Sequence, residues 1–96
     1  MALKFSGDTE TSQTIALKAL DYLAADEELL EPFLGATGLA VADLRSGATD
    51  SAFLAGILDY FLQNEALLLA FAGASELAPE TIVRARQGLP GALNDQ

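Results

Sequence analysis

One stretch of the sequence occurs twice at a constant offset of 38 residues, and this repetition constrains the fold more than any other feature. Residues 20–40 read LDYLAADEELLEPFLGATGLA and residues 58–78 read LDYFLQNEALLLAFAGASELA. Eleven of the 21 aligned positions are identical without a gap, whereas a composition this rich in Leu and Ala gives about two by chance. The same offset pairs Ser12 with Asp50. It predicts one domain, residues 1–96, with repeat units 12–49 and 50–87 and a disordered tail at 88–96.

Each unit has the periodicity of three helices. Apolar residues recur at spacings of three and four, which places them on one face of a helix. A good N-capping residue precedes the first two helices of each unit: Ser12, Asp26, Asp50 and Asn64. Gly38 suits a left-handed helix end, and Pro79 suits the first position of the last helix, 79–87. No segment alternates apolar and polar residues, so the predicted fold is all-α, a compact bundle of five or six short helices formed by two tandem three-helix repeats.

The two copies differ most at one place. The first has Glu31 and Pro32 where the second has Leu69 and Ala70. The segment from Leu67 to Ala72 is apolar nearly all round, which predicts the central and most buried helix, with a homodimer seam as the alternative. The acidic counterpart is expected at the surface, bent or split by its proline, which lacks a backbone N–H.

Composition excludes several classes of function. The chain has no cysteine and no histidine, so thiol chemistry, thiolate metal sites, and the commonest general base and transition-metal ligand are absent. Five basic residues stand against fourteen acidic residues, a net charge of −9. Nucleic acids and anionic membranes are bound by clustered Lys and Arg, so neither is expected as a partner. We expect no catalytic residues, no metal and no cofactor.

The sequence has no pattern typical of a secretory leader or a membrane span. Lys4 and Phe5 are followed by the polar run 6–14 rather than by an apolar segment. The most apolar stretch, 53–72, is interrupted by four polar residues, whereas a span needs about 20 predominantly apolar residues. These observations predict a cytoplasmic protein.

Two groups of charged residues are candidate sites. The first is an acidic cluster that could face a basic partner or simply stabilise the start of a helix: Asp26, Glu27, Glu28 and Glu31. The second is the repeated Asp–Tyr pair at Asp21 and Asp59. An aspartate near a helix C-terminus opposes the helix dipole, so we expect structural ion pairs there, with Arg45, Arg84 or Arg86 as donor. A role of the Asp–Tyr pairs in substrate binding is the alternative.

Residues 33–46, FLGATGLAVADLRS, have the spacing of a helix-turn-helix motif. A recognition helix needs donors for phosphates and base edges, and this one offers Arg45 alone. Asp50 and Ser51 resemble the prosthetic-group site of acyl carrier proteins, but the repeat accounts for Asp50 as a cap equivalent to Ser12. Both motifs therefore remain weaker interpretations.

The chain also resembles a known family. The elements IALKALDYLAAD, FLGATGL, DLR, FLAGILDYFLQNEALLLAFA and LAPETIVRARQGL, between Ile15 and Gly88, are similar to the bacterial family named domain of unknown function 3572. The sequence departs from that pattern at Val41, where a proline is expected, and at Pro32, where none is. The resemblance implies a small cytoplasmic helical protein and assigns no functional residues.

Taken together, these features favour a non-enzymatic module that binds a protein partner or regulates one. One alternative is a DNA-associated helix-turn-helix protein. A second is a small enzyme that uses carboxylates only, which would need a pocket beside Asp21 or Asp59.

Overall fold

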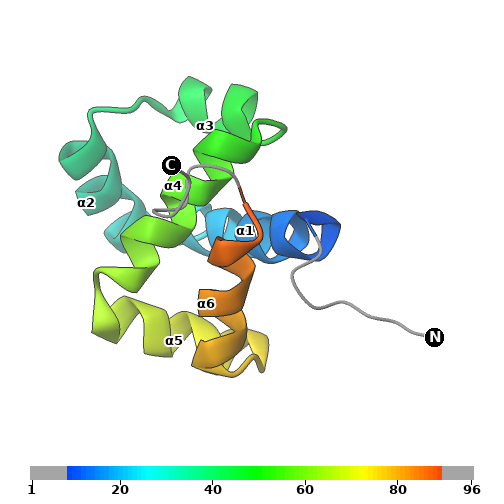
Figure 1. Ribbon diagram of the computed structural model, residues 1–96. Coiled ribbons are helices and arrows are strands. Elements are labelled where there is room, and N and C mark those ends of the chain that lie inside the picture. The colour runs from blue at the N-terminus through cyan, green and yellow to red at the C-terminus, as the bar shows by residue number, and fades with distance from the viewer. Residues whose placement is uncertain (1–8, 90–96) are drawn as a thin grey trace.

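The computed structural model describes residues 9–89 and shows an all-α bundle (Figure 1). Its described part contains six helices: α1 (Thr9–Ala24), α2 (Glu27–Thr37), α3 (Val41–Gly47), α4 (Ser51–Leu62), α5 (Glu65–Ser75) and α6 (Pro79–Gln87). The predicted fold class is therefore confirmed. The predicted tail, 88–96, lies almost entirely outside the described residues.

Helices α1 and α4 form the centre of the bundle, where they cross each other (Figure 1). Helix α1 also packs against α2 and α6, and α4 also packs against α5, α6 and α3. Five side chains of α4 are buried, namely Leu54, Ala55, Ile57, Leu58 and Phe61. The core consists of these side chains and of the apolar face of α1, which includes Ala16, Ala19 and Leu23.

The prediction that residues 67–72 form the most buried helix is wrong. Only Leu67, Phe71 and Ala72 of α5 are buried, whereas Ala70 is exposed and Leu69 is 50% exposed. Helix α5 lies at one end of the bundle and has neighbours on one side (Figure 1). Some of its apolar side chains are therefore left exposed to solvent.

Local capping interactions set the starts of three helices. The side chains of Asp26 and Asp50 each accept a hydrogen bond of 2.9 Å, from the backbone N–H of Glu28 and of Ala52. The side chain of Asn64 accepts one of 3.3 Å from Leu67. These bonds satisfy N–H groups that have no partner within the helix. The prediction for Ser12 is wrong: α1 begins at Thr9, so Ser12 lies inside the helix and is buried.

Two helices end in the left-handed conformation. Gly38, at the end of α2, has φ 75°, and Glu76, at the end of α5, has φ 58°. Glu76 is the one non-glycine residue with positive φ in the described part of the chain. Helix α2 continues through Pro32 as one element, so the predicted split does not occur.

Several contacts across the bundle join one copy of the repeated sequence to the other. The side-chain amide of Gln13 donates a hydrogen bond of 2.7 Å to the hydroxyl group of Ser51. The ring of Tyr22 lies 5.5 Å from that of Phe71, and the ring of Tyr60 lies 4.9 Å from that of Phe33 (centroid distances). The contacts of the two tyrosines are thus reciprocal. The division into two repeat units remains a prediction of the sequence.

No single helix in residues 9–89 is long and apolar enough to cross a membrane. Helices α4 and α5 would reach that length and apolarity only together, and they meet at a bend of 109°.

Candidate functional site

An open groove lies between α2 and α5, beside the C-terminal end of α4. Its volume is about 290 Å³, and the residues that line it are Glu28, Leu29, Pro32, Tyr60, Asn64, Ala66, Leu67 and Ala70. Residues 28, 29 and 32 share one face of α2, and residues 66, 67 and 70 share the same face of α5, because spacings of one turn bring side chains together. The two helices therefore present equivalent positions to the groove.

The floor of the groove is apolar and held in place by the core. Leu67 is buried, and Leu29 packs against the core from α2. Tyr60 reaches the groove from α4, where its ring makes an edge-on contact with the buried ring of Phe33. Aromatic contacts of this geometry stabilise the orientation of both rings. The floor is therefore a fixed feature of the folded chain.

Three polar groups on the lining are available to a ligand. The carboxylate of Glu28 and the hydroxyl group of Tyr60 make no hydrogen bond with any residue of the described part. The side-chain oxygen of Asn64 caps α5, so its amide nitrogen is the group left to bind. Apolar hollows with a few convergent polar groups are typical of binding sites.

The charged side chains at the groove are all acidic. Neither α2 nor α5 contains a lysine or an arginine, and none lines the groove. Of the predicted acidic cluster, Glu28 lines the groove, Glu27 and Glu31 are exposed on α2, and Asp26 caps the helix. A surface of one sign raises the local concentration of oppositely charged partners. This groove therefore favours a cationic ligand.

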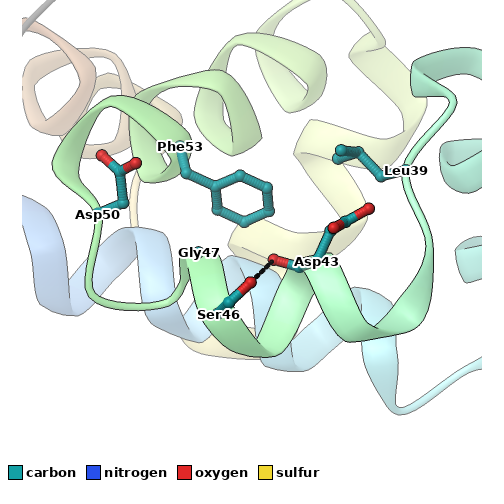
Figure 2. Close-up of a pocket in the computed structure, with 6 residues that line it drawn as sticks. All are labelled: Leu39, Asp43, Ser46, Gly47, Asp50 and Phe53. Carbon is teal, nitrogen blue, oxygen red and sulfur yellow. Dashed lines mark hydrogen bonds between the residues drawn. The ribbon is translucent and has the colours of Figure 1, made fainter.

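A second hollow, between α3 and α4, differs in how its polar groups are used. Its volume is about 320 Å³, and Figure 2 shows its six lining residues, with the ring of Phe53 next to Gly47. The carboxylate of Asp43 accepts the backbone N–H of Ala40 at 2.8 Å, and that of Asp50 caps α4. The hydroxyl group of Ser46 bonds to backbone carbonyls of its own helix. These groups serve local structure, so the groove between α2 and α5 is the stronger candidate site.

One ion pair of the expected kind forms at Asp59, and its donor is Arg86, one of the three candidate arginines. Arg86 of α6 donates two hydrogen bonds to Asp59 of α4. One runs from Nε to Oδ1 at 2.6 Å, and the other from Nη2 to Oδ2 at 3.2 Å. The side chain of Arg86 is 12% exposed and that of Asp59 is 44% exposed. A bidentate pair of this kind fixes the position of the guanidinium group. It connects α6 to the central helix.

The pairs predicted for Asp21, Arg45 and Arg84 do not form among residues 9–89, where all three are exposed. Residues two apart on a helix point in nearly opposite directions, at roughly 200°. Arg84 therefore points away from α4 when Arg86 points toward it. In the first half of the chain, the position 38 residues before Arg86 is Ala48, which offers no donor to Asp21.

The alternative sites find limited support in the geometry. Neither Asp21 nor Asp59 lines the two hollows described. No group of three or more potential metal ligands occurs in the described part of the chain. In the helix-turn-helix interpretation, α3 carries Arg45 at an exposed position, and α6 carries Arg86, whose guanidinium group is already paired.

Sequence reasoning identified Glu28 but missed Tyr60 and the apolar residues of the groove as site residues. The repeat contains the missing signal, because the lining includes three pairs of equivalent positions: Glu28 and Ala66, Leu29 and Leu67, Pro32 and Ala70. The sequence does not show that these residues of α2 and α5 line the same groove.

Comparison with known proteins identifies the family to which the chain belongs. No solved structure and no curated protein matches the chain. The model of one family, described as a protein of unknown function (DUF3572), matches residues 9–92, which include all six helices. The chain therefore belongs to the DUF3572 family of proteins of unknown function.

Proposed function

We propose that this protein is a non-enzymatic interaction module that binds another protein through the groove between α2 and α5. The observation that carries the proposal is the combination of an apolar floor with three available polar groups on an exposed surface. Protein interfaces commonly bury an apolar centre within a polar rim. The acidic face of α2 then contributes to the choice of partner.

The dimensions of the groove favour a macromolecular partner over a small substrate. Pockets for small molecules are typically about 300–1,000 Å³ and enclose most of the ligand. This groove, at about 290 Å³, lies at the lower limit of that range and is open to solvent. It suits the side chains of a partner's surface element better than an enclosed substrate.

The two alternatives are less well supported. DNA binding would need several free cations, and Arg86, one of the five basic residues, is engaged by Asp59. An enzyme that uses carboxylates only would need a pocket beside Asp21 or Asp59, and neither residue lines the two hollows described. A cytoplasmic location remains a prediction of the sequence.

Photo-crosslinking in cells tests the proposal. A benzophenone amino acid replaces Ala70 in the groove and, as the matched control, Val83, which is 40% exposed on α6. We expect a discrete protein adduct from Ala70 and none from Val83. The captured protein, once identified by mass spectrometry and purified, should bind the wild type and Val83→Trp equally.

Ala70→Trp, which fills the groove, should weaken binding of that purified protein by about tenfold or more, since the indole occupies space that the partner's side chains need at the centre of the interface. Equal adducts from both positions would contradict the proposal. So would unchanged affinity of Ala70→Trp.

A further inference from the structure

We propose that α3 is a lid that opens by unfolding as one unit while the rest of the described bundle stays folded, and that its opening uncovers the ring of Phe53 at the start of α4. This inference goes beyond the proposed function and does not depend on it. Helix α3 lies at the N-terminal end of α4, whereas the groove lies beside the C-terminal end.

Helix α3 has one main neighbour in the bundle. It packs on α4, and of its seven residues Leu44 alone is buried, while Val41 is 54% exposed. The hollow of about 320 Å³ between α3 and α4 leaves part of their facing surfaces unpacked. Figure 2 shows the ring of Phe53 at this hollow, next to Gly47 of α3. Few apolar contacts therefore hold α3 in place, which is typical of a segment that opens locally.

No side-chain hydrogen bond or ion pair joins α3 to another helix within residues 9–89. The carboxylate of Asp43 accepts the backbone N–H of Ala40, and the hydroxyl group of Ser46 donates to carbonyl groups of α3 itself. Arg45 is exposed. When α3 unfolds, no side chain of a neighbouring helix loses a hydrogen-bonding partner.

Helix α6 occupies the equivalent place in the repeated sequence and is held more firmly. It packs on α1, α4 and α5, and it buries both Ile82 and Ala85. Its Arg86 also donates two hydrogen bonds to Asp59 of α4. Leu44 and Ile82 are 38 positions apart, and each is the fourth residue of its helix. Two equivalent helices thus differ in the number of elements that hold them, and α3 is the one that separates first.

The helices before and after α3 are complete without it. Helix α2 ends at Gly38, whose backbone N–H donates to the carbonyl oxygen of Leu34 at 2.8 Å. Helix α4 begins with its own cap, in which the carboxylate of Asp50 accepts the backbone N–H of Ala52 at 2.9 Å. Isolated helices shorter than about 12–15 residues are marginal in water, and α3 has seven residues. When α3 leaves α4, residues 39–49 therefore unfold together between two fixed ends.

Native-state hydrogen exchange of the wild-type chain, followed by NMR, tests the proposal. Residues 44–47 of α3 and 82–85 of α6 occupy matched positions in their helices. We expect the amides of residues 44–47 to exchange at least about a hundredfold faster than those of 82–85, relative to unfolded-chain rates, because a local opening costs less free energy than global unfolding. Low concentrations of urea should accelerate exchange at 82–85 and leave 44–47 nearly unchanged, since a local opening exposes little surface.

A matched pair of substitutions tests which helices share the opening. Leu44→Ala should remove most of the remaining protection of residues 44–47 and leave α1 and α4 folded, because its cost cannot exceed the free energy that closes the lid. The ring signals of Phe53 should then move toward their values in an unfolded chain. Ile82→Ala should lower protection in α1, α4 and α6 together, and it should lower the Tm by more than Leu44→Ala does. Failure of Ile82→Ala to fold while Leu44→Ala folds is the extreme form of this result.

Equal exchange rates and equal urea dependence at residues 44–47 and 82–85 would overturn the proposal, because α3 would then unfold only with the whole bundle. Loss of protection in α1 and α4 that is as large in Leu44→Ala as in Ile82→Ala would also overturn it. So would Phe53 ring signals that do not change in Leu44→Ala, because the ring would then be covered by other elements.

Discussion

The left-handed backbone at Glu76 predicts that Glu76→Gly stabilises the protein. Glu76 ends α5 with φ 58° and ψ 39°, a conformation that costs a residue with a Cβ atom about 1–2 kcal/mol. Glycine removes that cost but gains freedom in the unfolded chain, which offsets about 0.5–1 kcal/mol. The expected gain from the backbone alone is about 0.5–1 kcal/mol in the free energy of unfolding, or a rise in Tm of roughly 2–8 °C for a chain of this size.

A second variant separates the backbone from the charge. A carboxylate at a helix C-terminus opposes the dipole, so its removal adds about 0.3–0.5 kcal/mol at an exposed site. Glu76→Gln removes the charge and keeps the Cβ atom in the left-handed region. Glu76→Gly should therefore be the more stable of the two by about 0.5–1 kcal/mol.

Gly38 provides the reciprocal test at the end of α2. Its φ is 75°, and a Cβ atom added there would meet nothing within 4 Å. Gly38→Ala should thus destabilise the protein through backbone strain alone, by about 0.5–1 kcal/mol. All three variants are compared by urea and thermal unfolding monitored by circular dichroism. A Glu76→Gly variant no more stable than Glu76→Gln, or a neutral Gly38→Ala, would refute the reasoning.

Three further substitutions test the packing. Phe61→Ala should cost about 3–5 kcal/mol of unfolding free energy in a urea titration, because Phe61 is fully buried in the central helix; a cost below 1 kcal/mol would contradict the assignment of α4 to the core. A double-mutant cycle with Arg86→Met and Asp59→Asn should give a coupling free energy of about 0.5–1 kcal/mol at low salt. A coupling free energy of zero would show that the ion pair does not stabilise the packing of α6 on α4. Gly47→Ala should destabilise by about 1 kcal/mol net, since its Cβ atom would lie 2.5 Å from an aromatic ring. The matched change Gly73→Ala, which meets nothing within 4 Å, should stabilise by up to about 1 kcal/mol; equal effects of the two alanines would exclude the steric explanation.

The candidate site was only partly accessible to sequence reasoning. Glu28 belongs to a run of acidic residues at a helix start, and such a run is visible in any sequence. Tyr60 and Ala70 become site residues because α4 ends beside the groove and α5 forms its far wall. These neighbours lie 32 or more positions from Glu28, and no local pattern indicates which distant helix covers which face.

The sequence by itself determined the features that depend on residues within one helical turn of each other. The caps at Asp26, Asp50 and Asn64 and the left-handed end at Gly38 are of this kind, because a side chain that bonds a backbone N–H two or three residues away needs no other helix. The start of α6 at Pro79 follows from the fixed φ of proline. The helices and the all-α class follow from such local terms.

Only the tertiary structure decided which apolar surfaces are buried and which cations are paired. Helix α5 is apolar on nearly every side, but Leu69 is half exposed, because the neighbouring helices cover only one side of α5. Asp59 is paired with Arg86 rather than Arg84, because the rotation of α6 about its axis is set by its packing on α1 and α4. Packing of this kind involves residues far apart in the chain, and its free energy is shared among all of them.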